Sequence, residues 1–225
     1  MNVAVLRARR WLWFGVLASL LVTVGCGNED ARATSPRNPA STSPAAQGSA
    51  QQFQSLFGGI AYDFEPMTPN EISDLSDLIV IGKIVDIQPG RTYKVAGDEG
   101  WSSQSLLLRL HTDQVIKADS PPEVGSDVYV ELPSSGGVSA AVYDAAAPKE
   151  ATVLLYLRRA GDPNPVDDAQ VAEVSKAWEE AGEVMEPTNP QSFVIGSEDR
   201  VFSVLTHGVS NSDSLEDYLP TSVPR

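Results

Sequence analysis

The stretch that decides the fold is Leu78–Ile87, which reads LIVIGKIVDI and is followed by Pro89-Gly90. Its β-branched residues and the turn residues that bound it predict a long, largely buried strand. Gly82 interrupts the apolar run, and a glycine inside a strand indicates a bulge or a sharp bend. A second long strand is expected over residues 106–117. The two strands are then able to pair as a hairpin joined by an extended loop.

Shorter apolar stretches follow and predict the rest of a β-rich domain. Strands are expected at Val128–Leu132, Val138–Tyr143, Thr152–Arg158, Ser192–Ile195 and Val201–Leu205, the last two as a closing hairpin. Thr68–Glu71 predicts the start of a short helix, because it combines an N-cap hydroxyl, a proline at the first helical position and a glutamate three residues after the cap. Pro165 starts a second predicted helix, whose apolar residues on one face are Val171, Val174, Trp178 and Ala181.

Many short strands with one or two helices predict a mainly β, α+β fold. We expect a small antiparallel OB-like barrel, with a β-sandwich as the alternative, because sheet edges must be closed or covered. Residues 77–158 resemble a loose class of uncharacterised secreted bacterial domains. The resemblance rests on the strand IVIGKIV, on Val115-Ile116-Lys117 and on Val124–Val128. It implies an OB-like barrel of unassigned function and carries over no catalytic residue.

The N-terminal segment has the layout of an export signal. Arg7, Arg9 and Arg10 precede an apolar segment that runs from Trp11 to Gly25. Signal segments have apolar cores of about 7–15 residues, whereas a membrane-spanning helix needs about 20, so this segment is short for a membrane span. The Arg9-Arg10 pair leaves both the general secretory route and the twin-arginine route open.

Thr23-Val24-Gly25-Cys26 ends this apolar segment and resembles the lipobox of bacterial lipoproteins, with Thr23 in the place of the usual aliphatic residue. The resemblance implies that residues 1–25 are removed as a signal peptide and that the Cys26 thiol carries lipid. Two or three acyl chains on one cysteine hold a protein durably at a membrane. We therefore expect a lipid-anchored protein on the extracytoplasmic face of the cell membrane. An ordinary secretory signal and an uncleaved signal anchor are the alternatives.

Composition sets the domain organisation and excludes some partners. Residues 26–53 are expected to be the lipidated cysteine and a disordered tether rich in small and polar residues, residues 54–210 a single β-rich domain, and residues 211–225 a loosely ordered tail. The formal net charge of −14 disfavours binding to nucleic acid. Cys26 is the only cysteine, so no intramolecular disulfide is available.

No catalytic or metal-binding motif stands out. The sequence contains no Gly-x-Ser-x-Gly elbow, phosphate-binding glycine loop or His-Glu-x-x-His motif. His111 and His207 lack the spacing of a metal pair and are expected to be structural. The acidic pair Asp167-Asp168 suits a helix start, and Glu179-Glu180 suits a solvated helix face. We expect no cofactor and no metal, and the loop Asp98–Trp101 lacks the pattern of a calcium loop.

Tyr93 and Trp101 are the candidate ligand-binding residues. Both are expected on the long loop between the first two strands, where exposed aromatic side chains are able to contact a glycan or an envelope protein. The alternative for Trp101 is that it covers an end of the barrel. The sequence thus predicts a non-enzymatic binding or interaction module tethered to the membrane. A cell-envelope hydrolase that uses carboxylates and a structural envelope component are the alternative functions.

Overall fold

The computed structural model describes residues 45–58, 64–95, 98–118, 122, 124–161, 169–197, 200–206, 212 and 214–221. All of them belong to one unit, Thr42–Arg225. The expected signal peptide, Cys26, His207 and the pair Asp167-Asp168 lie outside the described residues. Within the described part of the chain, no helix is long and apolar enough to cross a membrane.

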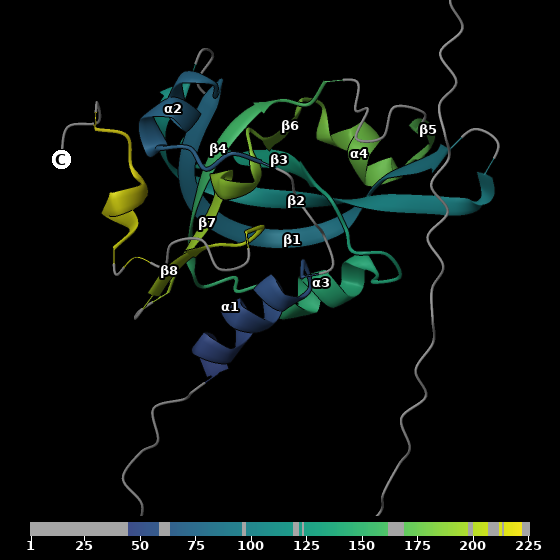
Figure 1. The fold of residues 1–225 in the computed structure, drawn as a ribbon, viewed down its shortest axis with the longest axis horizontal. Coiled ribbons are helices and arrows are strands. Elements are labelled where there is room, and N and C mark those ends of the chain that lie inside the picture. Colours follow the sequence, from purple (N-terminus) through teal and green to yellow (C-terminus); the bar gives the residue numbers. More distant parts are fainter. Residues whose placement is uncertain are drawn as a thin grey trace, which may run out of the picture. The chain divides into compact units, whose positions relative to one another are not determined.

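Eight strands form one mixed sheet (Figure 1). They are β1 (Leu78–Val95), β2 (Asp98–Ala118), β3 (Asp127–Leu132), β4 (Thr152–Arg159), β5 (Ala169–Val174), β6 (Val184–Pro187), β7 (Phe193–Ser197) and β8 (Arg200–Ser203). Their order is β5-β1-β2-β3-β6-β4-β7-β8, and only β3 and β6 run parallel. β1 also pairs with β4, so the pairings β1-β2-β3-β6-β4 return to β1 and close a ring. The predicted mainly β, α+β class is confirmed.

The predicted hairpin between the first two long strands is confirmed, and it is longer than expected. β1 and β2 pair from Leu78 opposite Ala118 to Val95 opposite Asp98, so most of the expected loop is strand. A register shift falls between Ile81 and Gly82, which confirms the predicted bulge. The far half of the hairpin extends beyond the ring and carries β5 at its edge (Figure 1).

Two apolar clusters lie on opposite sides of the strands. Alternate residues of a strand point to opposite faces. On β4, Val153 and Leu155 therefore join the first cluster, while Leu154 and Tyr156 join the second. The first cluster also takes Leu106, Leu108 and Leu110 of β2 together with Val128, Val130 and Leu132 of β3. The second cluster lies on the outer side of β1, β4 and β7.

The helix α1 (Ala45–Ser55) corrects the predicted boundary between tether and domain. The prediction that the disordered tether extends to Phe53 was wrong for residues 45–53. Phe53 is fully buried in the first cluster, and its ring lies edge-on to Phe57 at 5.3 Å and to Phe193 at 6.2 Å between centroids. Small polar residues around Ala50, Phe53 and Phe57 concealed their helical spacing in the sequence. α1 contacts α3 (Ala140–Ala146), which packs on the same cluster (Figure 1).

Two other predicted elements were wrong in type. Val138–Tyr143, expected as a strand, is largely replaced by α3, whose Ala140 and Tyr143 are buried on one helical face. The helix expected from Pro165 is replaced over residues 169–174 by β5, and only α4 (Lys176–Ala181) is helical. The projecting edge of β1 pairs with β5 from Arg91 opposite Val174 to Val95 opposite Ala169, and this pairing outweighs the helical spacing of the valines.

The C-terminal segment is held more firmly than predicted. The expectation of a loosely ordered tail was wrong for residues 214–221, which contain the short 3₁₀ helix η2 (Leu215–Tyr218). Leu215, Tyr218 and Leu219 pack against the second cluster, and the backbone N–H of Thr221 donates to Asn70 Oδ1 at 2.9 Å. Asn70 lies in α2 (Pro69–Asp74), where the predicted capping box is present. A further 3₁₀ helix, η1 (Pro190–Ser192), precedes β7.

Candidate functional site

The candidate site lies on the face of β1, β2 and β3 that points away from the first apolar cluster. Residues directly opposite each other on neighbouring strands lie on the same face of a sheet. Three rows of such residues cross this face: Lys83, His111 and Asp127; Asp86, Arg109 and Tyr129; and Gln88, Leu107 and Glu131. We call it the outer face. Most of its side chains are charged or polar, with Leu107 as the buried apolar exception, whereas the opposite face carries leucine, valine and isoleucine.

Four side chains on the outer face form a partly exposed polar strip: Asp86, Arg109, Asp127 and His111. Arg109 Nη2 lies 2.6 Å from Asp86 Oδ2 and so makes a close ion pair. Arg109 Nη1 lies 3.6 Å from Asp127 Oδ2, which is too long for a hydrogen bond. His111 Nδ1 lies 3.2 Å from Asp127 Oδ1. The exposed fractions of the side chains are 25 % for Asp86, 33 % for Arg109, 32 % for Asp127 and 48 % for His111, so solvent reaches all four.

The two aspartates hold Arg109 in its charged form. Partial burial acts to lower the pKa of Arg109, but the negative charges of Asp86 and Asp127 outweigh it, and the pKa lies above its ordinary value. Arg109 Nε is buried and has no hydrogen-bond partner. This buried nitrogen is not accessible to a ligand, whereas Nη1 is a donor that lies too far from Asp127 for a hydrogen bond.

A buried network adjoins the strip and consists of Arg91 and Tyr93 on β1 and Glu131 on β3, with the half-buried Trp178 of α4 against Arg91. Arg91 Nε donates to Glu131 Oε1 at 3.1 Å, and Arg91 Nη2 pairs with Glu131 Oε2. The Tyr93 hydroxyl donates to Glu131 Oε1 at 2.7 Å. The Arg91 guanidinium carbon lies 4.1 Å from the centre of the Trp178 ring, within the range of a cation–π contact.

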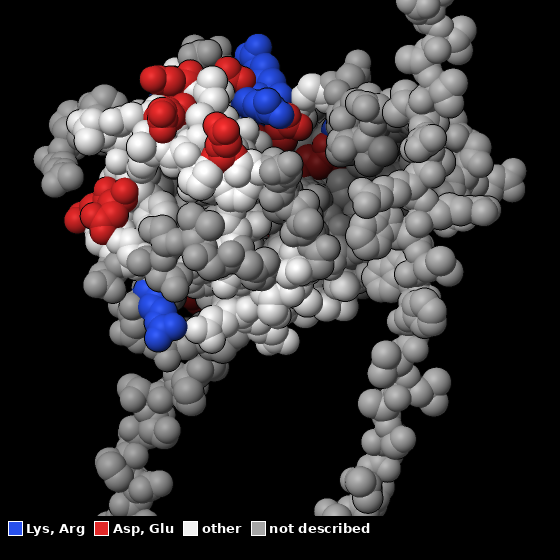
Figure 2. Space-filling model, in the orientation of Figure 1, with Lys and Arg blue, Asp and Glu red and all other residues white. Residues whose placement is uncertain are grey.

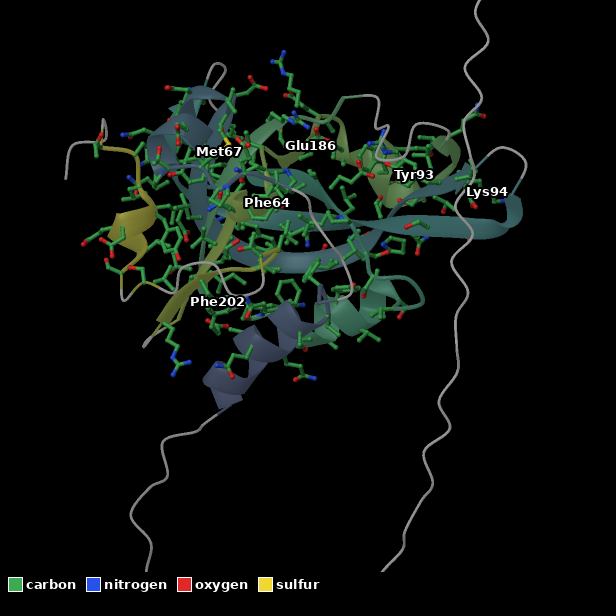
Figure 3. All side chains as sticks on the ribbon, viewed as in Figure 1. Phe64, Met67, Tyr93, Lys94, Glu186 and Phe202 are labelled. Carbon is green, nitrogen blue, oxygen red and sulfur yellow. The ribbon has the colours of Figure 1, made fainter. Side chains whose placement is uncertain are left out.

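Tyr93 is therefore not the exposed aromatic contact that the sequence predicted. It is only 6 % exposed, because the chain around it is strand rather than loop and because Glu131 and Arg91 contact its hydroxyl and its ring. Figure 3 shows Tyr93 beside α4, with Lys94 farther toward the tip of the hairpin. Burial, and next the hydrogen bond to Glu131, raise the pKa of Tyr93. The backbone of Trp101 lies in β2, and its side chain is outside the described residues, so its role stays a prediction.

Close backbone contacts hold the buried network in position. The backbone N–H of Arg91 donates to Ser105 Oγ at 2.8 Å. A Cβ atom on Gly90 would lie only 2.4 Å from the same Ser105 Oγ, so this approach of β1 and β2 needs glycine. Ser175, the N-cap of α4, donates its hydroxyl to Pro89 O at 2.6 Å and ties the helix to β1.

The two groups of side chains differ in what they are able to do. Both carboxylate oxygens of Glu131 are engaged by Arg91 and Tyr93, so the buried network serves as a support. The polar strip is open to solvent and presents both hydrogen-bond donors and acceptors. Glu179 and Glu180 are exposed on α4, as predicted. Within the described ranges, no group of three or more His, Cys, Asp or Glu side chains is arranged to hold a metal ion.

Sequence reasoning singled out His111 but missed its neighbours. His111 is exposed and alternates with buried leucines, as expected. The same alternation along the strand predicts that Arg109 lies on the same face as His111. Asp86 lies on β1 and Asp127 on β3, so only the register in which these strands pair with β2 brings them next to Arg109 and His111. No protein-family model, curated protein or solved structure matches the chain. The function is therefore inferred from the geometry of the strip and from the N-terminal sequence.

Proposed function

We propose that this chain is an exported lipoprotein, anchored through Cys26 on the extracytoplasmic face of the cell membrane, that acts as a non-enzymatic binding module. The observation that supports the binding role is the polar strip, which solvent reaches and in which Arg109 Nη1 and Asp127 Oδ2 lie too far apart to bond to each other. Residues 27–44 would join the lipid to α1. The buried network beside the strip fixes the strands that carry it, and such rigid support favours selective binding.

The proposal includes a finer classification of the fold as an OB-like barrel. The ring of pairings β1-β2-β3-β6-β4 supports it, and so does the position of α3 between β3 and β4 in the chain. The pairing of β1 with both β2 and β4 is what closure requires, whereas two separate sheets of a sandwich would not share it. Barrels of this kind bind ligands on the outer surface of their second and third strands, where the polar strip lies here.

The anchor is tested by replacing Cys26 with serine. We expect Cys26→Ser to move the protein from the membrane pellet to the supernatant and to abolish incorporation of radiolabelled palmitate, because serine lacks the thiol that would accept the lipid. The matched control is Thr23→Leu, which restores the aliphatic residue of the lipobox and should leave both readouts intact. Continued labelling and sedimentation of Cys26→Ser would contradict the anchor.

The binding role is tested by sedimenting the purified full-length chain, in detergent, with delipidated envelope fragments of the native bacterium. We expect saturable binding that Arg109→Gln weakens about tenfold or more, since a hydrogen bond to a charged group contributes about 1.5–3 kcal/mol. Arg158→Gln is the control, because Arg158 makes an exposed ion pair with Glu186 on another part of the sheet. Absence of saturable binding, or equal losses in both variants, would overturn the proposal.

A cell-envelope hydrolase is the second candidate function. It is favoured by one observation, the presence of Asp86 and Asp127 on the same face on either side of Arg109. Glycoside hydrolysis needs one carboxyl group to give up a proton while the other stays ionised. Release of new reducing ends from a bound glycan would support the hydrolase.

A further inference from the structure

We infer that the polar strip binds a neutral glycan through a vicinal diol, with Arg109 and Asp127 contacting its two hydroxyl groups. The inference rests on the proposed binding function and names the ligand class for the same site. It follows from three features of the outer face: an open donor–acceptor pair, a balance of charges and a neighbouring aromatic side chain.

The open pair is the wide contact between Arg109 and Asp127. Arg109 Nη1 and Asp127 Oδ2 are 3.6 Å apart, so their charges attract each other but the two atoms do not form a hydrogen bond. A hydroxyl group both donates and accepts, whereas the guanidinium only donates and the carboxylate only accepts. One hydroxyl of a vicinal diol is therefore able to accept from Arg109 while its neighbour donates to Asp127. Each of these two hydrogen bonds has one charged partner, the guanidinium or the carboxylate, and is therefore stronger than a hydrogen bond between neutral groups.

The charges of the strip favour a neutral ligand over a charged one. Asp86 and Asp127 are balanced by Arg109 and by Lys83, which lies opposite His111 on β1. The whole chain has a formal net charge of −14 and so disfavours anionic ligands. Figure 2 shows acidic side chains over α2 and near η2, so part of the negative charge lies on elements other than those that carry the strip. The formal charges of the strip and Lys83 thus cancel, although the molecule as a whole is strongly acidic.

Tyr129 supplies the apolar part of the site. It lies directly opposite Arg109 on β3 and is half-buried, so part of its side chain is reachable from the strip. Sugar rings have one face of C–H groups, and an aromatic side chain beside polar groups suits that face. At the other end of the strip, His111 Nδ1 lies 3.2 Å from Asp127 Oδ1 and helps to position this carboxylate. The strip thus offers both the hydrogen bonds and the apolar contact that a sugar unit requires.

The test is calorimetric titration of the full-length chain, in a detergent without a sugar headgroup, with neutral hexasaccharides of mannose, glucose and galactose. Each is used intact and after periodate cleavage followed by borohydride reduction, which opens the vicinal diols and leaves the chain neutral. We expect at least one intact hexasaccharide to bind and its cleaved form to lose affinity about tenfold or more. Asp127→Asn should weaken binding to a similar extent, and Glu186→Gln, which alters an exposed ion pair elsewhere, should not.

The outcomes separate the ligand class from the binding function. Failure of all three hexasaccharides, with envelope binding that still depends on Arg109, would overturn the glycan and leave the binding module standing. Loss of both would overturn both. Binding that survives periodate cleavage or Asp127→Asn would overturn the diol contact. An unfolded Asp127→Asn protein would show a changed far-UV circular dichroism spectrum, and the cleaved ligand then carries the test on the unaltered chain.

Discussion

Gly82→Ala is expected to lower the free energy of unfolding by more than about 3 kcal/mol, at or above the upper end of typical overpacking costs. A Cβ atom at this position would lie 2.1 Å from the backbone oxygen of His111, an approach that real structures do not tolerate. The backbone of β2 is unable to retreat, since it pairs with β3 at the same point. Nor is β1 able to shift easily, because Gly82 pairs with Val153 of β4 on its other side.

The measurement is urea unfolding of the full-length chain followed by far-UV circular dichroism. Gly196→Ala is the matched control, because Gly196 also lies in a strand and a Cβ atom there meets its nearest atoms at 3.7 Å, an ordinary contact. The control is expected to change the stability by less than about 1 kcal/mol. Equal effects of the two substitutions would show that the close approach at Gly82 is absent.

Glu131→Ala is expected to cost about 3–5 kcal/mol, the usual effect of removing one partner of a buried ion pair. Arg91 would keep its charge in a buried position without an acceptor, and the Tyr93 hydroxyl would lose its partner. Replacing both ionic partners with apolar residues, Arg91→Met with Glu131→Leu, should cost less than the single substitution, because no charge is then left unpaired.

Glu186→Ala is the control for this second prediction. Its partner Arg158 is more than half exposed, and exposed ion pairs contribute about 0–1 kcal/mol. Urea unfolding of the three variants and the unaltered chain gives the comparison. A loss below about 1 kcal/mol in the free energy of unfolding for Glu131→Ala would mean that Arg91 binds water or another acceptor. The buried network would then not stabilise the packing of β1 and β3.

The strands were more predictable than the helices, for identifiable reasons. Leu78–Ile87 predicts a buried strand with a bulge, because its β-branched residues and its glycine favour these features without reference to distant parts of the chain. α1 is hard to predict from the sequence because Phe53 is its single large apolar residue, and Leu56 and Phe57 follow only after its end. The spacing of Val171 and Val174 also fits a helical face and predicts a helix at β5, and only the pairing with β1 decides for a strand.

The candidate site was less predictable than the fold. The position of Arg109 and His111 on one face follows from alternation along a single strand. Their meeting with Asp86 and Asp127 depends on the register of β1 and β3 against β2, and the bulges in β1 change that register. The polar residues around Tyr93 predict a loop, whereas the long hairpin places it in β1, where it is buried against Glu131 and Arg91.

The closed ring of strands also has a kinetic consequence. β1 meets β2 next to it in the sequence, but it also pairs with β4, where the partner of Leu78 is Leu157. The parallel contact of β3 with β6 is confined to Tyr129 opposite Val184 and Val130 opposite Met185. Distant pairings form slowly, because the entropy lost in closing a long loop precedes any gain from contacts. The hairpin is thus able to form early, while the leucine side chains of β2 are still exposed to solvent. The chain is then prone to aggregate until β6 pairs with β3 and β4 and closes the ring.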